Sequence, residues 1–182
     1  MQILRIEEVK YGENEDEIYG ILFDGAWLWE EYINTILHKM GFIHPENKLR
    51  KGYIYLFEDI DEHGKIHRSG LRYPDFYKDD MVLDAKYKLL GSYEKVSKVD
   101  RDDIHQVITY MTNLNSTKGG FIAPLTQKQT MVPTSHLKGT ISTLSIFGIE
   151  INKTAKTYKD FCDKMNENEV AFIQSISQQW IV

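Results

Sequence analysis

The chain has 182 residues, of which 42% are hydrophobic and 27% are charged, and its formal net charge is -5. These values predict a single soluble domain with a sizeable core, and they exclude a disordered chain and a uniformly basic protein that coats DNA. The single cysteine, Cys162, excludes a disulfide framework and any zinc or iron–sulfur cluster built on cysteines of this chain alone.

The start of the sequence does not resemble a targeting or membrane segment. Its first residues lack the basic-then-apolar order of a signal peptide, and no apolar run in the chain is long enough to span a bilayer. We therefore expect a cytoplasmic protein with no membrane partner.

The first predicted elements are two short strands and a helix. Residues 2–9 alternate apolar and polar side chains, and residues 18–23 form a second strand candidate. Residues 24–41 predict a helix, with Asp24 as its N-cap and Gly41 as its stop. The apolar positions of this helix recur at helical spacing: Trp29, Ile33, Ile36 and Leu37.

The rest of the chain alternates between strands and helices. The predicted elements are, in order, a strand, turn and return at 52–70, a hairpin at 73–88, a helix at 99–114, a buried strand at 119–125, one or two strands at 139–151 and a helical region after Thr154. Asp100 or Asp102 can cap the helix at 99–114, and early acids suit its dipole. This order predicts the mixed α/β class.

The hairpin at residues 73–88 carries an unusual number of acids. If Asp79 and Asp80 form its turn, Asp75 falls directly opposite Asp84, and Lys86 lies on the same face as Asp84. The opposite face, which should pack on the core, carries Met81, Leu83, Ala85 and Tyr87.

Two opposed carboxylates cost stability, so this register calls for a compensating charge. Mg²⁺ binds through one or two carboxylates plus water and phosphate oxygens, and a nearby lysine can orient water and offset charge on a phosphate. This equipment suits phosphodiester hydrolysis. The alternative is a solvated surface hairpin whose turn slips by one residue and separates the acids.

The same residues resemble a known nuclease superfamily. Pro74 and Asp75, followed by Asp84, Ala85 and Lys86, resemble the PD-(D/E)XK pattern. The resemblance implies a restriction-endonuclease-like core, in which a mixed central sheet is flanked by helices. It also implies a single nuclease domain over 1–182, with a lead-in at 1–26, the core at 27–151 and a C-terminal helical region at 152–182.

Two helical motifs narrow the resemblance. "WLWEEYI" resembles the first-helix motif with a glutamate that faces the site; Glu30 aligns best with it, and Glu31 is the alternative. "QVITY", from Gln106 to Tyr110, resembles the Q-x-x-x-Y motif of the RecB-like branch, and its two ends share a helix face. "VLDAKYK" followed by "DIHQVITYM" is most similar to the nuclease domain of the McrC family.

The resemblance implies roles for individual residues. Asp75, Asp84, the Ala85 carbonyl and Glu30 would hold Mg²⁺, for which Mn²⁺ can substitute. Lys86 would position the attacking water, and Gln106 would orient Lys86 or the substrate. The residues expected to contact DNA are Tyr110, Lys88 and Lys118.

The implied partners are DNA, an McrB-like AAA+ GTPase and a second copy of the chain, because double-strand cleavage needs two active sites. Two other functions remain open at this point. The domain can be a RecB-like repair or phage nuclease, or a degenerate nuclease fold that serves as a docking module for a partner.

Overall fold

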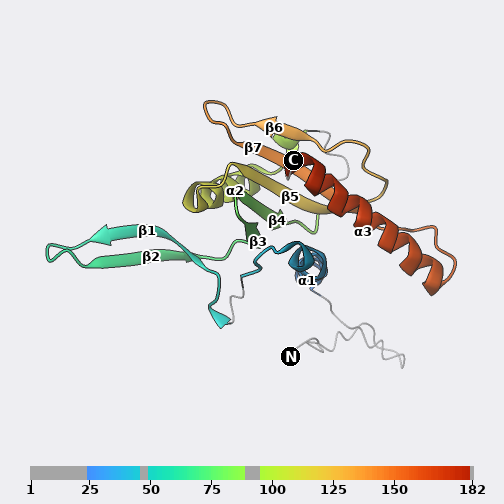
Figure 1. Cartoon of the computed structure of the whole chain (residues 1–182), viewed down its shortest axis with the longest axis horizontal. Coiled ribbons are helices and arrows are strands. Elements are labelled where there is room, and N and C mark those ends of the chain that lie inside the picture. The colour runs from blue at the N-terminus through green and yellow to red at the C-terminus, as the bar shows by residue number, and fades with distance from the viewer. Residues whose placement is uncertain (1–23, 46–48, 89–94, 181–182) are drawn as a thin grey trace, which may run out of the picture.

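The computed structural model describes residues 24–45, 49–88 and 95–180. Within this part, a five-stranded mixed sheet is flanked by helices, which confirms the mixed α/β class and the sheet arrangement expected of a restriction-endonuclease-like core (Figure 1). The strands predicted at 2–9 and 18–23 lie outside the described residues.

The central sheet combines a parallel interior with antiparallel edges. Its strands are, in spatial order, β3 (Phe76–Lys78), β4 (Met81–Ala85), β5 (Lys118–Leu125), β7 (Thr143–Glu150) and β6 (Thr134–His136). β4, β5 and β7 run parallel, whereas β3 and β6 pair antiparallel at the two edges. Parallel strands are covered on both faces, and the predicted apolar strand β5 accordingly lies in the middle of the sheet.

Each face of the sheet has its own apolar core. One core joins the sheet to α1 (Gly25–Leu37) and α3 (Tyr158–Trp180). The other joins it to α2 (Arg101–Leu114) and to the short helix η4 (Val96–Lys98). α3 confirms the helical region predicted after Thr154.

The first helix follows its sequence signals closely. The Asp24 side chain accepts hydrogen bonds from the backbone N–H groups of Ala26 and Trp27. A short helix, η1 (His38–Met40), continues the turn until Gly41, whose φ of 83° is the left-handed conformation that glycine tolerates. The buried side chains are those predicted: Trp29, Ile33, Ile36 and Leu37.

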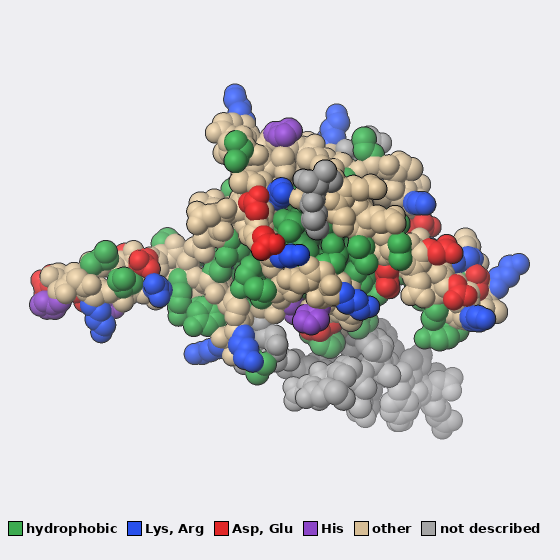
Figure 2. Space-filling model, viewed as in Figure 1, with side chains coloured by type: hydrophobic (Ala, Val, Ile, Leu, Met, Phe, Trp, Pro, Cys, Tyr) green, Lys and Arg blue, Asp and Glu red, His purple; other side chains and the backbone are tan. Residues whose placement is uncertain are grey.

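The strand, turn and return predicted at 52–70 form a separate hairpin. Strands β1 (Ile54–Ile60) and β2 (Ile66–Arg72) pair with each other and project from the body as an arm (Figure 1). Figure 2 shows that this arm mixes acidic, basic, histidine and hydrophobic side chains on the visible face, without a patch of one sign.

The β3–β4 hairpin has the predicted register. Lys78 pairs with Met81, so Asp79 and Asp80 form the turn, and Asp79 adopts a φ of 47°, which aspartate tolerates better than most residues. Asp80 accepts hydrogen bonds from the backbone and the hydroxyl of Thr117, which ties the turn to the start of β5.

One prediction for this hairpin is wrong in part. Tyr87 lies on the predicted side, beside Gly25 of α1, but it is not packed into the core, because β4 ends at Ala85 and leaves Tyr87 58% exposed. Nor is the opposite face solvated: Val82 is fully buried in the α2 core, and Asp84 is only 1% exposed. β4 is therefore an interior strand covered on both faces.

The close approach of β5 to β7 gives a test of this packing. A Cβ atom on Gly120 would lie 2.8 Å from the backbone oxygen of Ser145 and 3.1 Å from the Trp180 ring. Gly120→Ala should therefore lower the free energy of unfolding by about 1–3 kcal/mol in denaturant titrations, as for overpacked cores. Gly139→Ala is the control, because a Cβ there meets no atom within 4 Å and only the backbone φ of 85° is strained. A Gly120→Ala variant as stable as the wild type would contradict the packing.

Candidate active site

The β3–β4 register brings two aspartates together at one end of the sheet. Phe76 pairs with Leu83, so the next opposed positions are Asp75 and Asp84. Asp75 Oδ2 accepts a 2.7 Å hydrogen bond from the backbone N–H of Ala85, which holds the two strand ends together. Asp84 projects from β4 into the interior beneath α2 and is almost fully buried.

Both carboxyl groups are poorly solvated, and this raises their pKa values. Burial raises the pKa of Asp75 to about 7, with a further contribution from the negative charge of Glu30. Burial also raises the pKa of Asp84 to about 7, and Asp75 adds to this effect. The Ala85 N–H and the charge of Lys86 act in the opposite direction on Asp75 but do not outweigh burial. The pair therefore resists carrying two negative charges.

Lys86 places its ammonium group beside this pair. Its Nζ lies 2.7 Å from Asp84 Oδ2, 3.1 Å from Asp103 Oδ1 and 3.5 Å from Gln106 Oε1. Burial alone would lower the pKa of Lys86, but the carboxylates of Asp84 and Asp103 outweigh it and raise that pKa. Lys86 is therefore a cation at neutral pH.

The Q-x-x-x-Y motif of α2 contacts Lys86 through Gln106. Gln106 Nε2 donates a 3.0 Å hydrogen bond to the Tyr110 hydroxyl, while its Oε1 faces Lys86. The DNA contact predicted for Tyr110 is wrong, because its side chain is 4% exposed and packs in the α2 core. Tyr110 instead fixes the orientation of the Gln106 amide.

Asp103 is a site residue that the sequence analysis missed. The Asp100 side chain caps α2, and this start places Asp103 in the first turn, one turn before Gln106 on the same face. Its Oδ2 lies 3.0 Å from Lys88 Nζ, so it bridges Lys88 and Lys86. The spacing of three residues before Gln106 is the signal that could have found it.

Glu30 reaches the site from α1, and His44 lies between Glu30 and Asp75. Glu30 is the glutamate whose charge raises the pKa of Asp75, and burial in turn raises the pKa of Glu30 itself. The His44 ring stacks on Phe76, and its Nδ1 donates to the Asp75 carbonyl at 2.8 Å. His44 Nε2 lies 3.7 Å from Glu30 and 3.8 Å from Glu31. His44 was also missed, and nothing in its spacing connects it to Asp75.

Two lysines predicted to contact DNA lie in different places. Lys88 is 57% exposed at the rim of the site and pairs with Asp103. Lys118 lies further along the sheet: it pairs with Met81, three positions before the Asp84 pair, which is about 10 Å along the strand, and its DNA contact stays a prediction. Its Nζ donates to the Trp180 carbonyl, on the face that α3 covers.

The donor set fits a hard cation held by two carboxylates. Among the residues that the structure describes, no three His, Cys, Asp or Glu side chains lie close enough to hold a metal ion together. Glu30 is thus not placed as a direct third ligand beside Asp75 and Asp84. Asp84 Oδ2, however, is buried, and the partner that the described residues give it is the Lys86 ammonium at 2.7 Å. Magnesium sites commonly use one or two carboxylates and complete their shell with water.

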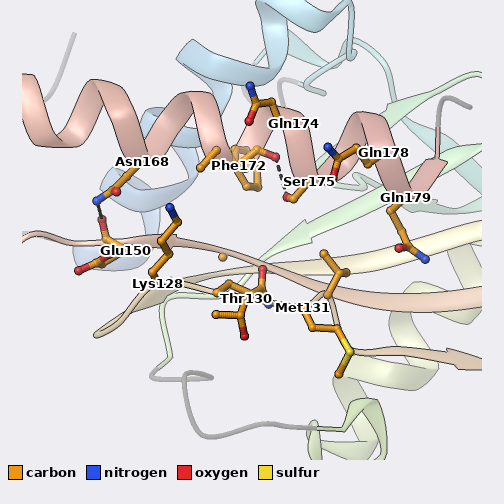
Figure 3. A pocket seen from close by; sticks show the side chains of 14 residues that line it. Lys128, Thr130, Met131, Glu150, Asn168, Phe172, Gln174, Ser175, Gln178 and Gln179 are labelled. Atoms are coloured by element: carbon orange, nitrogen blue, oxygen red, sulfur yellow. Dashed lines mark hydrogen bonds between the residues drawn. The ribbon is translucent and has the colours of Figure 1, made fainter.

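Two cavities lie beside α3, and neither is lined by Asp75, Asp84 or Lys86. A polar cleft of about 340 Å³ lies between α3 and residues 128–132, and amide side chains such as Gln174 and Gln178 line it (Figure 3). An apolar groove of about 490 Å³ lies between α1 and α3, and Tyr87 forms part of its wall. The candidate site is therefore distinct from both cavities.

The chain matches a known protein family. Residues 2–124 match the family described as McrBC 5-methylcytosine restriction system component. The chain belongs to this family. The match covers more than half of the chain and includes every residue assembled at the candidate site. No curated protein matches this McrBC family member.

One solved structure is similar to this McrBC family member. It is a half-complex from the tetradecameric assembly of Thermococcus gammatolerans McrB AAA+ hexamers with bound McrC. The match has 18% sequence identity and a TM-score of 0.47, and it covers 80% of this chain and 33% of the other. The chain thus spans about a third of the length of that relative.

None of the helices in the described part of the chain combines the length and the apolar character needed to cross a membrane.

The crowded aspartates predict an unusual dependence of stability on pH. A carboxyl group whose pKa is raised on folding stabilises the folded state fully below about pH 4, and this stabilisation is lost as the pH rises through about 7. Without divalent cations, Asp75→Asn should therefore melt roughly 3–6 °C above the wild type at pH 8 and match it near pH 4. Asparagine keeps the acceptor for the Ala85 N–H.

Asp102→Asn is the matched control for this experiment. It removes the same charge from a side chain that is 85% exposed, so this variant should not melt above the wild type at either pH value. If Asp75→Asn melted below the wild type at pH 8, the two aspartates would not be in conflict.

Proposed function

We propose that this McrBC family member is a Mg²⁺-dependent DNA endonuclease domain of the PD-(D/E)XK type, acting as the cleavage component of an McrBC-like restriction system. The observation that carries the proposal is the opposition of Asp75 and Asp84 in a buried site, with the Lys86 ammonium 2.7 Å from Asp84. The family match supports a role in a restriction system, and the residues of the site support phosphodiester hydrolysis.

The electrostatics favour a divalent cation at the aspartate pair. Burial and mutual repulsion disfavour two ionised carboxylates, and one ammonium supplies a single positive charge. When bound, Mg²⁺ or Mn²⁺ would supply a Lewis acid that activates water and offsets charge on a phosphate. Asp75 and Asp84 would hold it.

Two further groups complete the proposed binding site. The N–H of Ala85 points to Asp75, and in a strand the N–H and carbonyl of one residue face the same edge, so the Ala85 carbonyl is available as a ligand. Glu30 would act through an intervening water, because it is near enough to affect Asp75 but not part of a three-residue cluster.

The remaining residues orient the reaction, in which water attacks phosphorus and a sugar oxygen leaves. Lys86 would position the water and stabilise charge on the phosphate oxygens. Gln106 keeps Lys86 on this side of the site, and the Tyr110 hydroxyl keeps the Gln106 amide in place. Lys88, exposed at the rim, would contact a DNA phosphate.

The proposed partners follow from the family and from the geometry of cutting. McrB AAA+ hexamers accompany McrC in the similar solved structure, and an McrB-like AAA+ GTPase is accordingly the partner we propose. One site cuts one strand, so cleavage of both strands would bring two copies of the chain together.

A docking module is the second candidate. It is favoured by the lack of a three-residue metal cluster among the described residues and by the ion pair that already engages Asp84. Such a module would keep the McrBC-type fold without a reaction, so wild-type protein would show no divalent-dependent cleavage.

Cleavage of duplex DNA tests the proposal. With Mg²⁺ or Mn²⁺ and the McrB-like partner, wild-type protein should cut, and Lys86→Met should lower the rate about 10²–10⁴-fold because the group that orients water is lost. Lys153→Met is the control, since Lys153 is exposed on the segment before α3. Circular dichroism should show that both variants are folded. Cleavage by Lys86→Met at the wild-type rate would refute the assignment of Lys86.

A further inference from the structure

The Lys86 ammonium lies between acids that come from different elements. Asp84 of β4 is 2.7 Å away, and Asp103 of α2 is 3.1 Å away. Gln106 Oε1 adds a third oxygen at 3.5 Å. An ammonium group has three N–H donors and no acceptor, so these oxygens match its full capacity.

The inward position of Asp103 is not explained by its place in the helix. An acid in the first turn of a helix interacts favourably with the helix dipole, and this applies equally to Asp102 and Asp103. The Asp102 side chain is 85% exposed, 3.8 Å from Arg101. The Asp103 side chain is only 13% exposed. Burying it costs solvation that the dipole alone does not require.

The partners of Asp103 account for its burial. Its Oδ1 faces Lys86, and its Oδ2 lies 3.0 Å from Lys88. Burial raises the pKa of Asp103, but Lys88 and Lys86 outweigh burial and lower that pKa. Asp103 is therefore an ionised bridge between a lysine inside the site and a lysine at its rim.

The proposed cation site puts Lys86 in competition for Asp84. The oxygen that Lys86 contacts, Asp84 Oδ2, belongs to a carboxylate that would hold the divalent cation. Positive charges that share one carboxylate repel each other strongly at contact distance. Lys86 then needs a negative charge other than that of Asp84, and Asp103 Oδ1 already lies 3.1 Å away.

We propose that Asp103 is a positioning residue that retains Lys86 in the site when the aspartate pair is loaded. The Lys86 ammonium then gives up Asp84 Oδ2 and keeps the contacts with Asp103 Oδ1 and Gln106 Oε1 that it already makes. This inference rests on the proposed function, because it requires the cation site at Asp75 and Asp84. It adds a residue that belongs neither to the PD-(D/E)XK pattern nor to the Q-x-x-x-Y motif.

Competitive amine labelling tests the inference without relying on cleavage. The full chain is treated with a limiting amount of an amine-reactive ester, with and without Mn²⁺, and acylation of Lys86 is measured by mass spectrometry. Lys86 of the wild type should stay protected in both conditions. In Asp103→Asn, Mn²⁺ should raise Lys86 labelling about tenfold, as expected for loss of a charge-assisted contact. Without Mn²⁺, Asp84 should still protect it.

Asp102→Asn is the matched control, because it makes the same charge change in the same helical turn, and its Lys86 should label like the wild type. Asp103→Glu keeps the charge and should restore most of the protection. Over a range of DNA concentrations, Asp103→Asn should lower kcat with little change in KM.

The outcomes separate this inference from the proposed function. Absence of Mn²⁺ binding to the wild type by calorimetry would overturn both. Mn²⁺ binding with equal Lys86 labelling in the wild type and Asp103→Asn would overturn the inference alone. The wild type also provides a test if Asp103→Asn does not fold: release of wild-type Lys86 to the reagent on Mn²⁺ addition would contradict the retention proposed here.

Discussion

The opposition of Asp75 and Asp84 in a buried site is the constraint on which this structure depends. A one-residue shift in the β3–β4 register would turn Asp84 to the other face of the sheet. The turn at Asp79 and Asp80 sets this register, and the bonds from Thr117 to Asp80 anchor the turn to β5. The hairpin is thus held in the arrangement that brings two like charges together.

The groups around Asp75 and Asp84 partly offset the repulsion between the two carboxylates. The Ala85 N–H supports Asp75, and Lys86 supplies positive charge to Asp84. α2 contributes two groups that contact Lys86: the Asp103 carboxylate offsets its charge, and the Gln106 side-chain oxygen accepts a hydrogen bond from it. Because both apolar cores meet β4, the strand has little freedom to relax by moving the aspartates apart. The site is consequently tightly packed around Asp84 and short of positive charge.

The sequence predicted the local features of this site and missed those that depend on tertiary packing. Asp24 and Gly41 marked the ends of α1, and turn arithmetic paired Asp75 with Asp84, because capping and register are local rules. The error at Tyr87 arose because strand ends depend on neighbours. The burial of Tyr110, the remote position of Lys118 and the contacts of Asp103 and His44 all arise between elements distant in the chain. No periodicity encodes them.

Calorimetric titration with Mn²⁺ tests the central claim most directly. The wild type should bind about one equivalent, and its affinity should rise from pH 6 to pH 8 as protons leave aspartates whose pKa is raised to about 7. Asp75→Asn should abolish the binding heat, while Asp102→Asn should retain it. A wild type that binds no Mn²⁺ at pH 8, or an Asp75→Asn variant that binds it as tightly, would contradict a cation site formed by the two opposed aspartates.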